Sequence, residues 1–340
     1  MRRSLLAPLL FVAGCVLRRP DEPAVHVDAA RELEIVDDAT LAEVSRNDLD
    51  APLSFRHVVE TLADGHATPS AFVSAWLHAL GPDAERDARV AWQHDDLPLD
   101  RAPFRLIAVA NRMDLGGKPG ISDRGEGRLV YALTRGPADD ATSSPLATTV
   151  IFEFALPSPR TTKEWATAWH GLGALPLQSP EYREALVHVA MAFEQRASLS
   201  QVRWNDLALG MHELTLDDQG LLVVSVLRNT PPRTSDGAPE LVSFVKAHVD
   251  DVAKDAYLLP PSLSGTSTMP DPRPWTMPGV DDDTREVFRL GTCGGCHANQ
   301  ALDGGFHISP LQHDQAKVSP LLKVDLERRA ELLRKNLGAE

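Results

Sequence analysis

Cysteine is scarce in this chain of 340 residues, which contains three. They stand at positions 15, 293 and 296, so a framework of long-range disulfides is excluded. Long apolar runs are also absent beyond the first fifteen residues, which excludes a later transmembrane helix of about 20 residues. The sequence therefore predicts a globular protein that depends on a hydrophobic core.

Several catalytic signatures are missing as well. The chain has no G-x-x-x-x-G-K-[ST] phosphate loop and no G-x-S-x-G nucleophile turn. Asn111–Asp114 is similar to the base-binding N-K-x-D of GTPases, but without a phosphate loop it does not predict nucleotide binding. His212-Glu213 lacks the second histidine of the zinc-protease motif H-E-x-x-H.

Basic residues are outnumbered by acidic residues, 34 against 48, which gives a net charge of −14. Nucleic acids and anionic membrane surfaces attract proteins of the opposite balance, so neither is predicted as a partner. A basic protein partner or cations are compatible with this charge.

The first fifteen residues have the parts of an export signal. Arg2 and Arg3 precede the apolar run 5–12, which small residues follow. Val12-Ala13-Gly14-Cys15 resembles the lipobox of bacterial lipoproteins, in which the cysteine is acylated and becomes the new N-terminus. We expect a signal peptide over 1–14, lipidation of Cys15 and a membrane anchor through that lipid. Because Val rather than Asp occupies position 16, outer-membrane sorting is favoured.

The remaining chain divides by composition and periodicity. Residues 15–35 predict a tether, and 36–260 predict one main domain in which strands are grouped between helices. The proline-rich segment 261–283 predicts a linker or an extended wrap, and 284–340 a small helical unit. Because regular alternation of strand and helix is absent, we expect an α+β fold with a mixed or antiparallel sheet and packed helices.

One motif carries strong chemistry, namely Cys293-Gly294-Gly295-Cys296-His297. C-x-x-C-H is the attachment signature of c-type haem, in which two thiols form thioether bonds and the histidine is the proximal iron ligand. Attachment takes place outside the cytoplasm, which agrees with the export signal. We therefore predict one covalent haem c on Cys293, Cys296 and His297.

Other uses of the cysteine pair stay open. The two thiols could form a redox or structural disulfide, or they could supply half of a zinc site together with His297. The second axial iron ligand is also open, because no methionine follows Met277. His307 is the favoured candidate, and His313, Met269, Met277 or a vacant position are alternatives.

Two polar or aromatic groupings have simpler interpretations. Asp123, Glu126 and Arg128 surround glycines before a strand and could form a carboxylate site, although a turn held by an Arg–carboxylate pair explains them as well. Trp165 and Trp169 stand four residues apart and predict packing on one helix face.

Four segments together resemble a set of uncharacterised bacterial cell-envelope proteins. The segments are the motifs P-F-R-L at 103–106, N-R-M-D-L at 111–115, G-E-G-R at 125–128 and C-G-G-C-H at 293–297. The resemblance covers about 100–310. Because that family places an aromatic residue and a histidine after its C-x-G-C-H motif, the resemblance implies that His307 belongs to the site.

These observations predict a lipid-anchored protein of the cell envelope that binds one haem c and takes part in electron transfer with a redox partner protein. An electron carrier or binding protein is favoured over a catalyst. The alternative is a non-haem interaction protein whose C-terminal cysteines form a disulfide or metal clip. A redox enzyme is a third interpretation.

Overall fold

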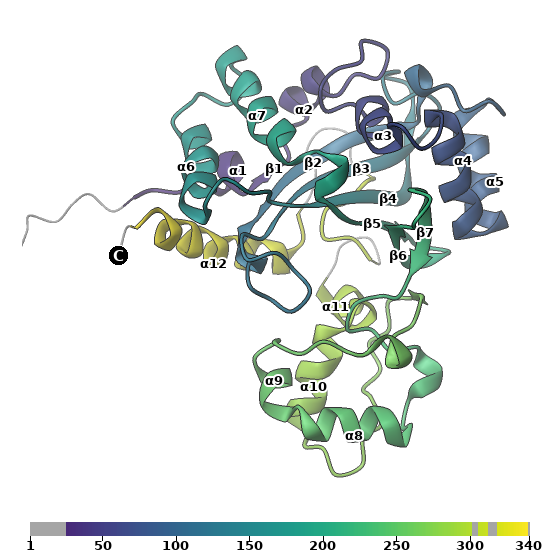
Figure 1. The fold of residues 1–340 in the computed structure, drawn as a ribbon, viewed down its shortest axis with the longest axis vertical. Coiled ribbons are helices and arrows are strands. Elements are labelled where there is room, and N and C mark those ends of the chain that lie inside the picture. Colours follow the sequence, from purple (N-terminus) through teal and green to yellow (C-terminus); the bar gives the residue numbers. More distant parts are fainter. Residues whose placement is uncertain (1–24, 301–304, 312–317, 339–340) are drawn as a thin grey trace, which may run out of the picture.

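An open antiparallel sheet of eight strands forms the centre of the molecule, in the order β1-β2-β3-β4-β5-β6-β7 with β8 paired to β6 (Figure 1). The structure is a computed structural model that describes residues 25–300, 305–311 and 318–338. The α+β prediction is confirmed, with the sheet antiparallel. The strands are β1 (Glu34–Ile35), β2 (Phe104–Arg112), β3 (Glu126–Arg135), β4 (Ser144–Ala155), β5 (Leu199–Asp206), β6 (Gly210–Leu216), β7 (Leu222–Ser225) and β8 (Ser267–Thr268).

Helices cover one face of this sheet and build a smaller lobe on the other side (Figure 1). Local capping signals start several of them, as at α4, where the Thr68 hydroxyl accepts from Ala71 N–H and Pro69 takes the first helical position. The helices are α1 (Ala29–Glu32), α2 (Asp38–Val44), α3 (Phe55–Ala63), α4 (Pro69–Leu80), α5 (Pro82–Trp92), α6 (Thr162–Gly173), α7 (Pro180–Phe193), α8 (Pro239–Ala247), α9 (Val249–Ala253), α10 (Asp282–Gly291), α11 (Cys293–Gln300) and α12 (Pro320–Leu337).

The helix-covered face of the sheet carries the main core. Alternate residues of the central strands point into it, including Phe104, Tyr131, Phe152 and Trp204. Phe55 of α3 stacks on Phe104 with ring centroids 4.2 Å apart. The predicted packing of Trp165 and Trp169 is confirmed, because both are buried in this core.

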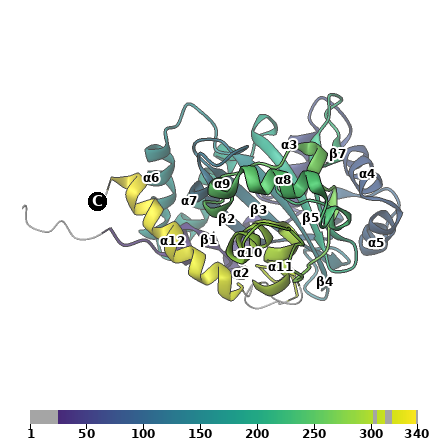
Figure 2. The same cartoon turned by 90° about the horizontal axis from the view of Figure 1, so that it is seen from below.

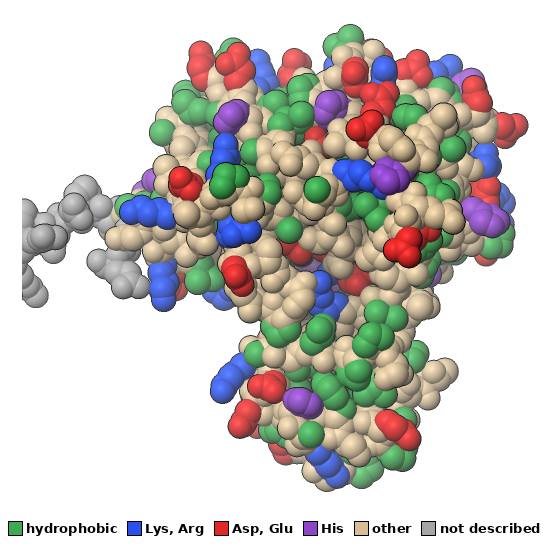
Figure 3. All heavy atoms as spheres, in the orientation of Figure 1, with side chains coloured by type: hydrophobic (Ala, Val, Ile, Leu, Met, Phe, Trp, Pro, Cys, Tyr) green, Lys and Arg blue, Asp and Glu red, His purple; other side chains and the backbone are tan. Residues whose placement is uncertain are grey.

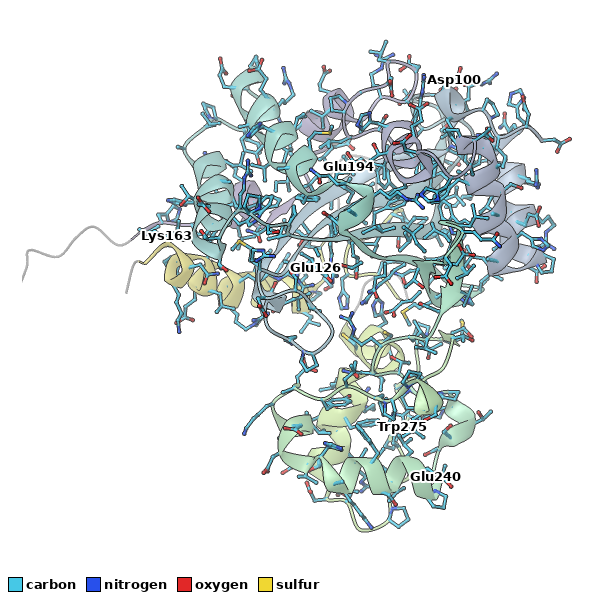
Figure 4. The ribbon with its side chains drawn as sticks, in the orientation of Figure 1. Asp100, Glu126, Lys163, Glu194, Glu240 and Trp275 are labelled. Carbon is cyan, nitrogen blue, oxygen red and sulfur yellow. The ribbon has the colours of Figure 1, made fainter. Side chains whose placement is uncertain are left out.

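The smaller lobe has a core of its own. It gathers side chains from α8, α9, α10 and the proline-rich segment, among them Leu241, Trp275, Met277 and Phe288. Figure 4 shows Trp275 inside this lobe, with Glu240 on α8. The segment predicted as a linker or wrap is thus an extended wrap that supplies core residues to the lobe.

Two predicted boundaries differ from the structure. The tether predicted over 15–35 ends earlier, because Glu34 and Ile35 pair with Ala110 and Val109 as an edge strand of the sheet. The C-terminal residues do not form one unit, because α12 leaves α10 and α11 and packs Ala330 and Leu333 into the main core. Within the described ranges, no helix combines the length and the apolar character needed to cross a membrane.

Candidate functional site

Helix α11 presents the C-x-x-C-H residues on one side. Thr292 starts the helix, because its hydroxyl accepts from Gly295 N–H at 3.1 Å and its carbonyl accepts from Cys296 N–H at 3.0 Å. Residues three and four apart share a face of a helix. Cys293, Cys296 and His297 therefore point to the same side, and all three line one cavity.

The two glycines of the motif let the opposite side of α11 pack closely. A Cβ atom on Gly294 would lie 2.7 Å from the carbonyl oxygen of Met269, and one on Gly295 would overlap the carbonyl of Arg289. Larger residues would push the helix away from this support. The glycines thus fix the orientation that turns the cysteines and His297 toward the cavity.

The cavity has a volume of about 660 Å³ and lies between α10, α11 and α12 and the second face of the sheet, opposite the main core. Its walls include the apolar side chains of Val130, Ile151, Leu290 and Phe306. Figure 2, seen from below, shows α10 and α11 in front of the sheet with α12 running beside them. The volume falls within the range of roughly 300–1,000 Å³ that small-molecule and cofactor sites occupy.

Two histidines meet at this cavity. His297 Nδ1 donates to the carbonyl of Gly305, a bond that leaves Nε2 as the nitrogen with a free lone pair. A histidine that ligates a metal is commonly oriented in this way by its other nitrogen. The rings of His297 and His307 lie 4.6 Å apart between centroids, so the predicted pairing of these residues in one site is seen in the geometry.

His307 is held by the residues that open α12. Its Nδ1 lies 3.0 Å from the Ser319 hydroxyl, and its carbonyl accepts from Ser319 N–H at 2.8 Å. Its Nε2 lies 3.5 Å from Cys296 Sγ. Burial, together with the nearby His297 and arginine side chains, lowers the pKa of His307 to about 3. A neutral imidazole is the form that binds a metal.

Both cysteines of the motif are free thiols in the structure. Burial raises the pKa of Cys293, and burial together with Cys293 raises the pKa of Cys296 to about 11. The thiolate is the reactive form of cysteine in exchange reactions. Burial therefore favours the protonated thiol form at both cysteines.

A row of alternating charges crosses the second face of the sheet beneath the cavity. We call it the charged row, and its members on β3, β4, β5 and β6 are Glu126, Arg128, Glu153, Arg203 and Glu213. Arg203 Nε lies 3.1 Å from Glu153 Oε1, and its Nη2 lies 3.2 Å from Glu213 Oε1. Each of the three glutamates is at least 98% buried.

The charged side chains of this row shift the pKa values of one another and of the C-x-x-C-H residues. Burial raises the pKa of Glu153, but Arg128 and Arg203 outweigh that effect and hold the pKa below its ordinary value. At Glu213, burial prevails and the pKa is raised. Arg203 also acts on Cys293 and His297, because its positive charge lowers the pKa of both groups. In Figure 3, basic and acidic side chains reach the surface at the constriction between the two lobes.

The other residues predicted as ligands or as the lipid site lie in different parts of the molecule or outside its described ranges. Met277 is buried in the core of the smaller lobe. Met269 lines a different hollow of about 550 Å³ on the far side of α11. His313 and Cys15 lie outside the described residues. Of the described candidates for a second axial ligand, His307 is the one that lines the cavity.

Sequence reasoning missed several residues around this site. His212 and Glu213 line the cavity although they match no zinc-protease motif. The suggested pairing of Glu126 with Arg128 is present at 2.8 Å, but it belongs to the charged row rather than to a turn. The recurring charges on β3–β6 are visible in the sequence, but such a pattern ordinarily indicates a solvated strand face.

The donor set fits a haem better than a bare metal ion. A porphyrin supplies four nitrogen ligands itself, so the protein needs to add only one or two. In the described part of the chain, no group of three or more His, Cys, Asp or Glu side chains is placed to hold a metal ion.

No protein-family model, curated protein or solved structure matches this chain.

Proposed function

We propose that this protein binds one haem c covalently through Cys293 and Cys296 and serves in electron transfer in the bacterial cell envelope. The observation that carries the proposal is the arrangement of α11. It directs both thiols and His297 into a cavity of about 660 Å³, with the proximal candidate His297 already oriented by Gly305.

Each residue of the site has a defined role in this proposal. Cys293 and Cys296 would hold the haem by thioether bonds, His297 would be the proximal iron ligand and His307 would be the second ligand. Bound haem supplies one-electron oxidation and reduction. The apolar strand residues Val130 and Ile151 would limit water at the ring, and His307 would occupy the iron position that a substrate needs. Electron transfer is therefore favoured over catalysis.

The proposed location rests on the sequence. The signal over 1–14, the lipobox cysteine Cys15 and the resemblance to envelope proteins support export and a lipid anchor in the outer membrane. Replacement of Cys15 by Ser should move the protein from the membrane fraction to the soluble fraction and abolish labelling by a fatty acid. Retention of both the label and the membrane association would contradict this part of the proposal.

The test of haem binding is a spectrum of protein made with the haem-attachment machinery in an exporting host. A Soret band that survives denaturation is expected for the wild type, and it should be lost in Cys293→Ser/Cys296→Ser. His307→Ala is the matched control, because it alters iron ligation and leaves both thioether bonds intact. A colourless wild type would overturn the proposal and favour the non-haem binding protein with a disulfide or metal clip.

A further inference from the structure

The N-terminal end of α12 holds His307 by three contacts. The Ser319 hydroxyl meets His307 Nδ1, and the Ser319 N–H donates to the His307 carbonyl. A β-bridge joins the next residue, Ile308, to Val318. Ser319 is fully buried, and its hydroxyl also accepts from Leu322 N–H as the N-cap of α12. The position of His307 is thus tied to the position of this helix.

Two ion pairs join the middle of α12 to the main domain, and the one between Arg329 and Glu34 is buried. Arg329, 5% exposed, donates to Glu34 on β1 at 3.0 Å and to Asp325 at 2.6 Å. Arg328 donates to Asp114 at 2.7 Å. Burial alone would raise the pKa of Asp114, but Arg112, Arg329 and Arg328 hold it well below the ordinary value. The carboxylate is therefore charged at neutral pH.

These contacts give a role to the motif Asn111–Asp114, which has none in the haem-binding proposal. In Asn111–Asp114, the Asn111 side chain accepts from Met113 N–H and donates to the carbonyl of Glu32. Arg112 donates to Asp114 at 2.8 Å. The motif therefore presents one oriented carboxylate at the end of β2, where two arginines of α12 arrive.

We propose that α12 is the positioning element for the second haem ligand. Ser319 is the positioning residue that directs His307 Nε2 into the cavity, and Asp114 and Glu34 fix the helix from which Ser319 acts. This inference rests on the proposed haem function. It gives the N-R-M-D sequence a role in positioning the second haem ligand. A purely structural role would only hold α12 against the main domain.

The test compares two helix caps of the same local sequence. Ser319-Pro320 opens α12, and Ser179-Pro180 opens α7, where the Ser179 hydroxyl accepts from Tyr182 N–H at 3.1 Å. Loss of either hydroxyl weakens an N-cap, but only Ser319 touches a histidine of the site. Ser319→Ala, Ser319→Thr and Ser179→Ala are prepared as haem-loaded protein and compared by visible and electron paramagnetic resonance spectra.

We expect six-coordinate low-spin haem in the wild type, Ser179→Ala and Ser319→Thr. Ser319→Ala should convert most of the haem to the high-spin form, as His307→Ala does, and added imidazole should restore the low-spin spectrum in both. Asp114→Asn should give a smaller change in the same direction. A low-spin spectrum in Ser319→Ala, or a high-spin spectrum in Ser179→Ala, would overturn the inference. Absence of covalent haem from the wild type would instead overturn the proposed function.

Discussion

The two faces of the central sheet are built in opposite ways. On the helix-covered face, aromatic rings from α3, α4 and four strands contact one another, and side chains such as Phe55 and Trp76 are fully buried. On the second face, the strands carry the charged row and border a cavity of about 660 Å³. Figure 4 shows Glu194 on the helix side of the sheet and Glu126 on the other side.

This difference suggests that the helix-covered face stabilises the fold and that the second face serves binding. Close packing of apolar groups stabilises the fold, whereas buried ion pairs contribute little net stability because each charge loses its hydration. The second face thus combines a cavity with three buried carboxylates and two partly exposed arginines, which favours binding over stability as its role. The predictions below test this division, in order of decreasing expected effect.

The first prediction sets one core residue against one cavity residue. Trp76→Ala should lower the free energy of unfolding by about 3–5 kcal/mol, because Trp76 contacts Phe55, Phe104 and Trp204 and is fully buried. Ile151→Ala should cost less, about 1–2 kcal/mol, because Ile151 is only partly buried and borders an existing cavity. Urea unfolding measures both values. Equal losses would show that the second face is packed as tightly as the first.

The second prediction concerns Glu194, a carboxyl on the helix side with His57 Nε2 3.8 Å away. Burial raises its pKa from 4.5 to about 8, against an opposing effect of Thr61. The unfolded chain releases this proton at lower pH than the folded chain, so stability from this group is present at low pH and is lost between about pH 4.5 and pH 8.

Replacement of this carboxyl by an amide should remove that loss. Between pH 5 and pH 9, Glu194→Gln should gain roughly 3–4 kcal/mol over the wild type in the free energy of unfolding. The exposed Glu184→Gln on the same helix is the control. Parallel pH profiles for wild type and Glu194→Gln would show that the helix side accommodates a charge as well as the second face does.

The third prediction tests the charged row. Arg203→Met should cost about 3 kcal/mol, because Glu153 and Glu213 would remain buried beside each other without their shared cation. Addition of Glu213→Gln should recover part of the loss. The exposed Arg86→Met should change the unfolding free energy by about 0.5 kcal/mol or less. A double variant no more stable than Arg203→Met would show that the row is not coupled.

The fourth prediction compares two helical glycines. Gly295→Ala should destabilise the protein by about 1–3 kcal/mol, since the new Cβ would overlap the Arg289 carbonyl. Gly171→Ala in α6 meets open space and should stabilise by about 0.5–1 kcal/mol. Melting temperatures of both variants, with and without haem, measure the effects. A neutral Gly295→Ala would mean that α11 can shift freely above the second face.

The parts of the fold that local chemistry determines were predictable. A hydroxyl N-cap followed by proline starts α4 at Thr68-Pro69, and an Asp- and Gly-containing turn over Asp217–Gly220 joins β6 to β7. Helix α5 is hard to predict, because a Gly-Pro pair ordinarily ends a helix, whereas Pro82 occupies the first position of the next one. Strands β2 to β6 are detectable in the sequence because their apolar residues face one common core.

The site was predictable only where its residues are adjacent in sequence. Cys293, Cys296 and His297 fall within five positions and share a face of one helix. The charged row depends on the register of four strands, and alternating charge on a strand ordinarily predicts a solvated face. Ser319 reaches His307 from twelve residues away through a β-bridge, which no local pattern reports.

The pair between Glu34 and Arg329 joins positions 295 residues apart, so it connects the first strand of the sheet to the last helix of the chain. A contact of such long sequence separation carries a large loop-closure cost, so contacts of this kind slow folding. If the protein is exported N-terminus first, as proposed, α12 also crosses the membrane after Cys293 and Cys296. We therefore expect Cys293 and Cys296 to stay accessible to the enzymes that attach haem until α12 docks. Haem could then be attached only before α12 docks.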